Sequence, residues 1–288
     1  MRIGIAVKPG LADAAETLAG IELWLASHSV GSSWEPAAAA LLPPGERRVV
    51  ERADLPRDAD LVLVLGGDGT LLALAKAIAE TNRDIPILAV NFGSLGFLTE
   101  ITRPEIYSSL DAVLAGTAEH DQRMMLRAVA NRAGAAPSTH WALNDIVFTR
   151  TALSRMIDLA IWVGDQFVAS VKADGLIVAS PTGSTAYNLA AGGPIVHPAM
   201  DALVLTPIAP HMLTNRPIVI PAERDVRVRS NSANAGNIYV TFDGQSGFEM
   251  QEGDEIAIAR APKPLRLVRS SSRSYFDVLR QKLKWNER

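Results

Sequence analysis

The stretch "LVLVLGGDGTLLALAKAIAE", residues 61–80, decides the fold that this sequence predicts. Its continuous apolar run is typical of a strand that is buried on both faces of a parallel sheet. The run ends in two glycines, an aspartate, a third glycine and a threonine, and an apolar helical pattern follows at once. A strand, a tight turn and a helix are therefore expected. Asp68 would lie at the carboxyl end of the strand, where open parallel sheets bind ligands.

The same alternation continues on both sides of this turn. Further strands are expected at 2–7 and 85–92, and helices at 11–28, 71–80 and 103–116. We interpret 27–48 as a weak strand followed by a surface loop. Buried strands that alternate with helices predict an α/β domain over residues 1–120, with helices on both faces of a parallel sheet.

From about residue 121 the pattern changes to short strands separated by turns. Gly-Asp, Asp-Gly and Gly-Asn pairs separate several apolar segments, and some of these segments alternate strictly. This pattern predicts a β-rich domain over 121–267, in which 184–192 is the clearest helical segment. The remaining tail, 268–288, contains an amphipathic helical pattern at 274–285. We expect this helix to pack back on the first domain.

The composition limits the classes of function. The chain has 288 residues, of which 48% are hydrophobic, enough for one large core or two ordinary ones. The net charge of -3 favours neither nucleic acid nor an anionic membrane surface as a partner. There is no cysteine, which excludes disulfides, thiolate metal sites and cysteine nucleophiles, and fits a cytoplasmic location. The apolar runs are too short for a signal sequence or a membrane span.

The glycine-rich turn offers the chemistry of a phosphate site. Gly66 and Gly67 let the backbone turn sharply and approach a ligand closely. The free N–H groups and the positive dipole end of the following helix suit a phosphate. A carboxylate at Asp68 would then serve with a magnesium ion between it and the phosphate, or with a hydroxyl to deprotonate. A plain helix start, with Asp68 and Thr70 as caps, explains the same residues, so the turn alone leaves the function open.

Three other segments limit the function that the glycine-rich turn can have. They are "NFGSLGFLTE" (91–100), "LNDIVFTR" (143–150) and "ADGLIVASPTGSTAYNLAAGGPIVHP" (173–198). Taken singly, Asn144 and Asp145 could form a turn or a strand end, and Thr182 or Ser184 could cap a helix before a packed tyrosine. Together with "LGGDGTLL", and in this order along the chain, the segments resemble the NAD kinases.

The resemblance implies an enzyme that uses ATP to phosphorylate the 2′-hydroxyl of the adenosine ribose of NAD, giving NADP. It implies a divalent cation such as Mg²⁺, bound with ATP near Asp68 and without dedicated protein ligands. The implied fold is a Rossmann- or phosphofructokinase-like α/β domain followed by a β-rich, sandwich-like domain. The expected assembly is a homodimer or homotetramer with shared NAD sites, and neither a nucleic acid nor a membrane is expected as a partner.

Carried over to this chain, the resemblance makes Asp68 the catalytic residue. The nucleotide-binding residues that it implies are Gly69, Asn144, Asp145, Arg155, Lys172, Asp174, Thr185, Ala186, Tyr187, Asn188, Leu189, Ala190, Ala209 and Gln245. The chain departs from the family pattern at Ala173, where glycine is common, and at Ala190, where serine is frequent. Two other functions stay open at this point. One is a lipid or sugar kinase with a similar glycine turn, and the other is a dinucleotide sensor without turnover.

Overall fold

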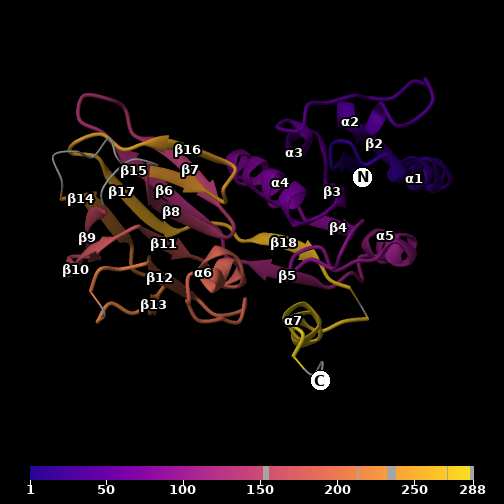
Figure 1. Ribbon diagram of the computed structural model, residues 1–288. Coiled ribbons are helices and arrows are strands. Elements are labelled where there is room, and N and C mark those ends of the chain that lie inside the picture. Colours follow the sequence, from indigo (N-terminus) through magenta and orange to yellow (C-terminus); the bar gives the residue numbers. More distant parts are fainter. Residues whose placement is uncertain (152–155, 213, 232–237, 271, 286–288) are drawn as a thin grey trace. The chain divides into compact units, whose positions relative to one another are not determined.

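A computed structural model describes residues 1–151, 156–212, 214–231, 238–270 and 272–285 (Figure 1). The chain forms two compact units. The first consists of Met1–Gln122 and Leu265–Arg288, and the second of Arg123–Pro264. No helix in the described part of the chain is long and apolar enough to cross a membrane.

A six-stranded sheet with the order β2-β1-β3-β4-β18-β5 forms the centre of the first unit. Its strands are β1 (Arg2–Val7), β2 (Gly31–Trp34), β3 (Leu61–Gly66), β4 (Ile87–Asn91), β5 (His120–Arg123) and β18 (Leu265–Val268). β1 pairs in parallel with β2 and β3, and β4 pairs in parallel with β3 and β18. Every residue of β3 and β4 is buried, as their continuous apolar sequences predict.

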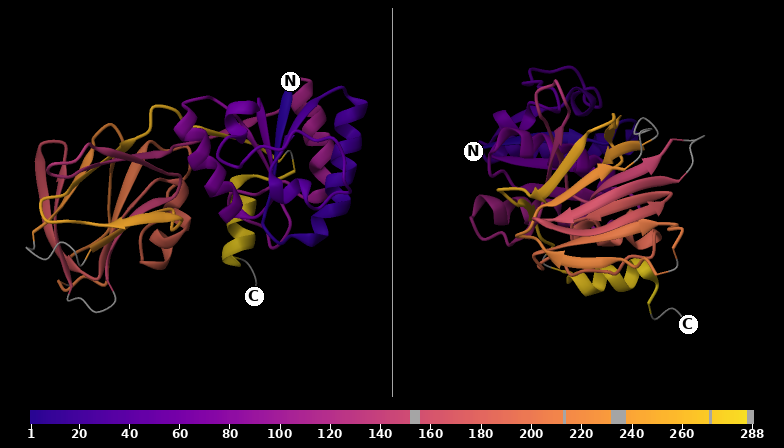
Figure 2. Two further views of the ribbon diagram at one scale, coloured as in Figure 1. Left: turned by 90° about the horizontal axis from the view of Figure 1, so that it is seen from above. Right: turned by 90° about the vertical axis from the view of Figure 1, so that its left-hand side faces the viewer.

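Helices lie on both faces of this sheet (Figure 2). They are α1 (Ala15–Ser27), α2 (Pro36–Ala39), α3 (Leu55–Asp58), α4 (Asp68–Thr81), α5 (Ile106–Leu114) and α7 (Tyr275–Leu283), with 3-10 turns η1 (Ala12–Ala14) and η2 (Arg103–Glu105). Ile5 of β1 joins a core with Leu18 of α1 and Leu110 of α5. Gly4, its neighbour, faces the opposite side and approaches Leu55 of α3. The α/β fold class expected for this part of the chain is confirmed.

The first unit differs from the sequence expectation in several places. Helix α4 begins at Asp68 rather than at 71, because extended Gly67 is its N-cap. Helices α2 and α3 were not expected, since a four-residue helix has too few positions to show a period. Strand β18, expected in the second domain, pairs with β4 through Leu267 and Ile87. A strand this short carries no sequence signal of which sheet it will join.

The second unit consists of two six-stranded antiparallel sheets, β10-β9-β14-β17-β6-β7 and β13-β12-β11-β8-β15-β16. The strands are β6 (Leu126–Asn131), β7 (Ser138–Ala142), β8 (Asp145–Arg150), β9 (Ile157–Val163), β10 (Gln166–Ala173), β11 (Gly175–Ala179), β12 (Ala202–Ile208), β13 (Ile218–Pro221), β14 (Val226–Ser230), β15 (Ile238–Phe242), β16 (Ser246–Glu249) and β17 (Glu255–Arg260). The helical segments are η3 (Thr182–Thr185) and α6 (Tyr187–Ala190).

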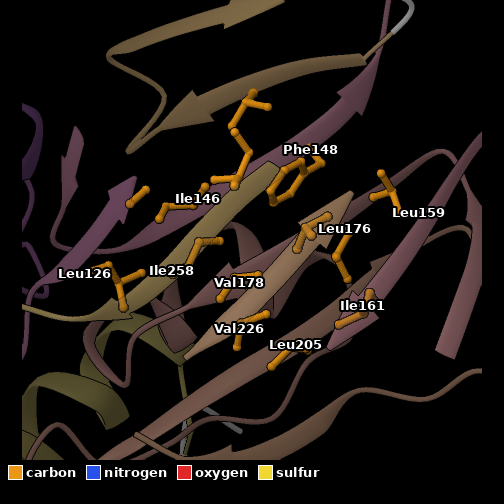
Figure 3. Close-up of a cluster of buried hydrophobic side chains, with 14 of the residues drawn as sticks. Leu126, Ile146, Phe148, Leu159, Ile161, Leu176, Val178, Leu205, Val226 and Ile258 are labelled. Carbon is orange, nitrogen blue, oxygen red and sulfur yellow. The ribbon is translucent and has the colours of Figure 1, made fainter. Parts of the chain in front are cut away.

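Both sheets contribute side chains to one apolar core (Figure 3). Leu159 and Val226 come from one sheet, and Phe148 and Leu176 come from the other. Buried apolar residues alternate with exposed or partly buried ones along β6 and β17, which is the pattern of a sheet with one face in a core. The expected β-rich, sandwich-like domain is confirmed.

Candidate active site

Asp68 is the first residue of α4, and the loop after β4 binds its carboxylate. Oδ2 accepts one hydrogen bond, from the N–H of Phe97 at 2.9 Å. Oδ1 accepts three, from the N–H of Leu98 at 3.3 Å, the N–H of Thr99 at 3.1 Å and the Thr99 hydroxyl at 3.0 Å. A carboxylate has about four lone-pair positions. Oδ2 is therefore the oxygen that can still bind a metal ion or a ligand hydroxyl.

Two glycines allow this arrangement. A Cβ on Gly96 would overlap Asp68 Oδ1, so only glycine lets the loop close over the carboxylate. A Cβ on Gly66 would lie 2.9 Å from Thr70 Oγ1 and 3.0 Å from Lys8 Cβ. Gly69, in contrast, is exposed and has open space where a Cβ would be. The predicted glycine turn is thus sterically required at Gly66, while Gly69 leaves room beside Asp68.

Asp68 lies in a cavity of about 370 Å³. Its lining residues all belong to the first unit and are Lys8, Leu11, Gly66, Gly67, Asp68, Asn91, Phe92, Gly93, Ser94, Gly96, Thr99 and Lys282. Asn91 shapes one wall, because its amide group donates to Ser94 O and accepts from the N–H of Gly93. Glycines, small polar residues and two lysines therefore make up most of the lining around the carboxylate, and Leu11 and Phe92 are its large apolar members.

In the second unit, the predicted pair Asn144 and Asp145 leads into β8. The carboxylate of Asp243 fixes the backbone at residues 143–145, which we call the Asn144–Asp145 corner. It accepts the N–H groups of Leu143 at 2.7 Å, Asn144 at 2.7 Å and Asp145 at 3.1 Å. The sequence analysis missed Asp243, although Asp243 and Gln245 belong to one turn. Its Asp-Gly pair signals only a hairpin turn, since nothing in the sequence indicates that its carboxylate binds another loop.

Two carboxyl groups therefore lie close together in this corner. Burial and the charge of Asp243 raise the pKa of Asp145 to about 7, although the hydrogen bond from the Tyr187 N–H acts to lower it. Burial also raises the pKa of Asp243, while its three backbone hydrogen bonds act to lower it. Those bonds favour the ionised form of Asp243, so Asp145 is the member of the pair that takes the proton near neutral pH.

The loop after β11 packs directly on this corner. Ser180 donates its N–H to Asn144 O at 2.9 Å and its hydroxyl to Leu143 O at 2.5 Å. A Cβ on Gly183 would overlap the carbonyl group of Asn144, so this close approach requires glycine. The N–H of Tyr187 reaches the Asp145 carboxyl group. The structure thus brings the "LND" and "TGSTAY" segments together.

Within this loop the predicted residues lie in different environments. The Thr185 hydroxyl donates to Thr182 O at 3.3 Å, and Ala186 links η3 to α6. The Tyr187 side chain is 44% exposed. Asn188 is fully buried, donates to Ser184 O and Pro194 O, and accepts from the Thr206 hydroxyl. Leu189 is partly buried and Ala190 is exposed. Tyr187 is therefore the side chain most accessible to a ligand, whereas Asn188 fixes the loop.

The other predicted residues lie at the opposite end of β11. Asp174 pairs with Arg150 through Oδ1 and Nε at 3.0 Å. Ala209 follows Ile208, whose carbonyl accepts the Asp174 N–H, and has a positive φ of 43°. That conformation is strained in a non-glycine residue. Lys172 is exposed, with its Nζ 3.6 Å from Asp158 Oδ2.

Two predicted residues remain. Gln245 is exposed in the turn that contains Asp243, at the Asn144 end of β11. Arg155 lies outside the described residues. Ala173, at the position where the family prefers glycine, belongs to β10 and does not have a positive φ. A side chain is therefore acceptable there. Among the described residues, no group of three or more His, Cys, Asp or Glu side chains could hold a metal ion.

Comparisons with known proteins cover both units. The family model for the ATP-NAD kinase N-terminal domain matches residues 3–118, and that for the C-terminal domain matches 143–270. The chain is 48% identical to the NAD kinase of Geotalea daltonii over 265 residues, which is 92% of each chain. It is 43% identical to that of Syntrophotalea carbinolica over 287 residues, covering 100% of this chain and 99% of the relative.

Solved structures agree with these matches. Yeast NADH kinase complexed with NADH has a TM-score of 0.90 and 26% identity, with 100% of this chain and 89% of that chain covered. An NAD kinase from Archaeoglobus fulgidus in complex with ATP has a TM-score of 0.77 and 26% identity, with 99% of both chains covered.

Proposed function

Since the chain belongs to the NAD kinase family, we propose that its Asp68 cavity receives ATP and that its Asn144–Asp145 corner receives NAD. The protein phosphorylates NAD with ATP. The assignment of ATP to the Asp68 cavity rests on Asp68, which lines this cavity and whose Oδ2 accepts one hydrogen bond. The cysteine-free composition favours a reducing cytoplasm as its location.

In the proposed reaction, the 2′-hydroxyl oxygen of the adenosine ribose attacks the γ-phosphorus of ATP. The bond from this phosphorus to the β,γ-bridging oxygen breaks, and ADP leaves. Asp68 Oδ2 accepts the proton of the hydroxyl as the new bond forms, which contributes roughly 10²- to 10⁴-fold. The four hydrogen bonds to Asp68 orient it before the substrates bind.

A divalent cation such as Mg²⁺ suits this cavity. Mg²⁺ is commonly bound by one or two carboxylates together with substrate phosphates and water, rather than by a complete protein cage. The ion would bind with ATP near Asp68, with phosphate oxygens and water as its ligands, which leaves Asp68 Oδ2 free to accept the proton. When bound, the ion neutralises the charge that develops on the transferred phosphoryl group.

The Asn144–Asp145 corner would recognise the dinucleotide. Asn144 offers a donor and an acceptor, and Asp145 offers acceptors or, when protonated, a donor. Together they can bind a ribose diol or the edge of an adenine. The exposed ring of Tyr187 lies on the adjoining loop and can pack against a base. Hydrogen-bonding groups beside an exposed aromatic ring suit a nucleoside, which favours NAD over the lipid of a related kinase.

We also propose that two subunits share each NAD site, in a homodimer or homotetramer. Asp174 and Lys172 lie at one end of β11, and the Tyr187 loop lies at the other. The five residues of β11 separate the two groups by about 17 Å, at roughly 3.3 Å per residue. Two copies related by a two-fold axis could each supply one group to the other's site. Sedimentation and activity over one dilution series test this, and full activity in a dissociated monomer would contradict it.

One assay tests the proposed function. Purified protein is incubated with Mg²⁺, ATP and NAD, and NADP is measured with an NADP-specific dehydrogenase. Formation of NADP together with ADP in equal amounts is expected. Binding of NAD without turnover would instead support the sensor, and phosphorylation of a lipid or sugar but not of NAD would support the related kinase. The Asp68→Asn variant is the control for contaminating kinases.

A further inference from the structure

Two ammonium groups line the Asp68 cavity, and they come from opposite ends of the chain. Lys8 directly follows β1, and Lys282 lies in the last turn of α7. Within the described ranges, neither lysine forms an ion pair with a carboxylate. By contrast, Arg52 in the same unit pairs with Glu35. Unpaired cations that line a cavity are available to a ligand of negative charge.

Because of these lysines, the charge of the cavity suits a triphosphate. Asp68 alone would give the lining a charge of -1 and would repel phosphate. Lys8 and Lys282 are the other charged residues of the lining, and they change its sum to +1. We propose that Lys282, with Lys8, binds the β- and γ-phosphates of the phosphoryl donor. The inference rests on the proposed function, in which this cavity receives ATP.

Lys282 is also placed against the loop that holds the catalytic carboxylate. Its Nζ lies 5.6 Å from the centre of the Phe97 ring. The N–H of Phe97 donates to Asp68 Oδ2, the oxygen assigned to proton transfer. A phosphate that contacts Lys282 would therefore lie beside the residue that orients this oxygen. The aromatic contact holds the ammonium group without neutralising its charge.

The segment before α7 is firmly attached to the first unit, and this attachment positions Lys282. Glu105 Oε1 accepts hydrogen bonds from Ser270 Oγ at 2.8 Å and from Ser272 Oγ at 2.5 Å. Arg273 donates to Glu100 O at 2.9 Å. Helix α7 then begins with a capping box and buries Val278 and Leu279. The helix is thus fixed at its start, while the long side chain of Lys282 reaches the cavity from its last turn.

The test compares Lys282→Met with Arg280→Met, which removes the same charge from the same helix. Arg280 does not line the cavity and pairs with Asp277 at the surface. For Lys282→Met we expect kcat/KM for ATP to fall by roughly 10- to 100-fold, the effect of losing one charge-assisted hydrogen bond. The KM for NAD should stay within about twofold of the wild-type value. Lys282→Arg should retain most of the activity, because it keeps the charge.

Calorimetry with ATP and AMP separates a phosphate contact from general damage. Lys282→Met should weaken ATP binding and leave AMP binding unchanged, because AMP lacks the β- and γ-phosphates. Unchanged ATP kinetics and binding in Lys282→Met, or an equal loss in Arg280→Met, would overturn the inference. If the wild-type protein formed no NADP, the proposed function would fail. The ATP titrations of the two variants would still decide the role of Lys282.

Discussion

Replacing Asp243 with Asn would test how the Asn144–Asp145 corner is held in place. Asp243 Oδ1 accepts the N–H groups of Asn144 and Asp145, and Oδ2 accepts that of Leu143. The amide oxygen of an asparagine can keep the first two bonds, but its NH₂ group would face the Leu143 N–H. Asp243 has a positive φ of 51°, which asparagine also tolerates. The substitution therefore removes one hydrogen bond and one charge with little backbone strain.

The lost bond sets the magnitude of the effect. Removing a hydrogen bond to a charged group costs about 1.5–3 kcal/mol of unfolding free energy. A second effect depends on pH, because the variant also removes the charge that helps to raise the pKa of Asp145 to about 7. A carboxyl group whose pKa is raised by folding stabilises the protein fully at a pH below its pKa in the unfolded chain. This stability is lost as pH rises through its pKa in the folded protein. In the variant, the pKa of folded Asp145 is lower than in the wild type. The variant therefore loses less unfolding free energy than the wild type between pH 5.5 and pH 8.

Two measurements test this reasoning. Urea unfolding at pH 5.5 and pH 8 should show a larger destabilisation of Asp243→Asn at pH 5.5. Hydrogen exchange of a peptide that contains residues 143–145 should be roughly 10- to 100-fold faster in the variant, because the Leu143 N–H loses its partner. Asp201→Asn, which changes an exposed aspartate of the same unit, is the control. Equal destabilisation at both pH values, or unchanged exchange at 143–145, would refute the reasoning.

Three further predictions follow from contacts described above. Asp68→Asn should lower kcat by roughly 10²- to 10⁴-fold, with the KM for NAD within a few-fold of wild type, because it replaces the oxygen that we propose accepts the proton; initial rates of NADP formation check this. Gly183→Ala should weaken NAD binding at least about tenfold but leave ATP binding unchanged, because its Cβ would displace Asn144; calorimetry with both nucleotides decides. Glu105→Gln should remove an acid-dependent loss of stability. Burial acts to raise the pKa of Glu105, but hydrogen bonds, chiefly from serine and threonine hydroxyls, outweigh burial and lower the pKa to about 2. The unfolding free energy of the wild type therefore falls as pH drops from about 4.5 towards 2. Urea unfolding between pH 3 and 5 should show this slope in the wild type and not in the variant.

The sequence predicted the elements whose signals are local. Strands β1 and β3 were predicted because their apolar runs are continuous, and α4 because glycines and a helical period follow β3. The position of Asp68 at the end of β3 followed from the same pattern. The four hydrogen bonds that fix its carboxylate could not be predicted, because their donors lie some 30 residues away in the chain.

Residues that act through distant partners were missed for the same reason. Asp243 binds backbone N–H groups about 100 positions earlier, and a backbone donor has no residue type to recognise. Lys282 reaches the Asp68 cavity only because β18 and α7 return to the first unit. A lysine on an amphipathic helix looks like an ordinary solvent-facing residue until that return is known.

The return of the chain to the first unit has a consequence for synthesis on the ribosome. The second unit, Arg123–Pro264, is contiguous and can fold as soon as it emerges. The first unit has to wait on the order of 10 s for that stretch to be translated before β18 arrives. This late strand inserts between β4 and β5, in the interior of the sheet. A nascent chain that stops before Leu265 would hold a complete Asn144–Asp145 corner but an unfinished sheet and no Lys282. Translation of the last residues thus decides whether the first unit can complete its sheet and the lining of the Asp68 cavity.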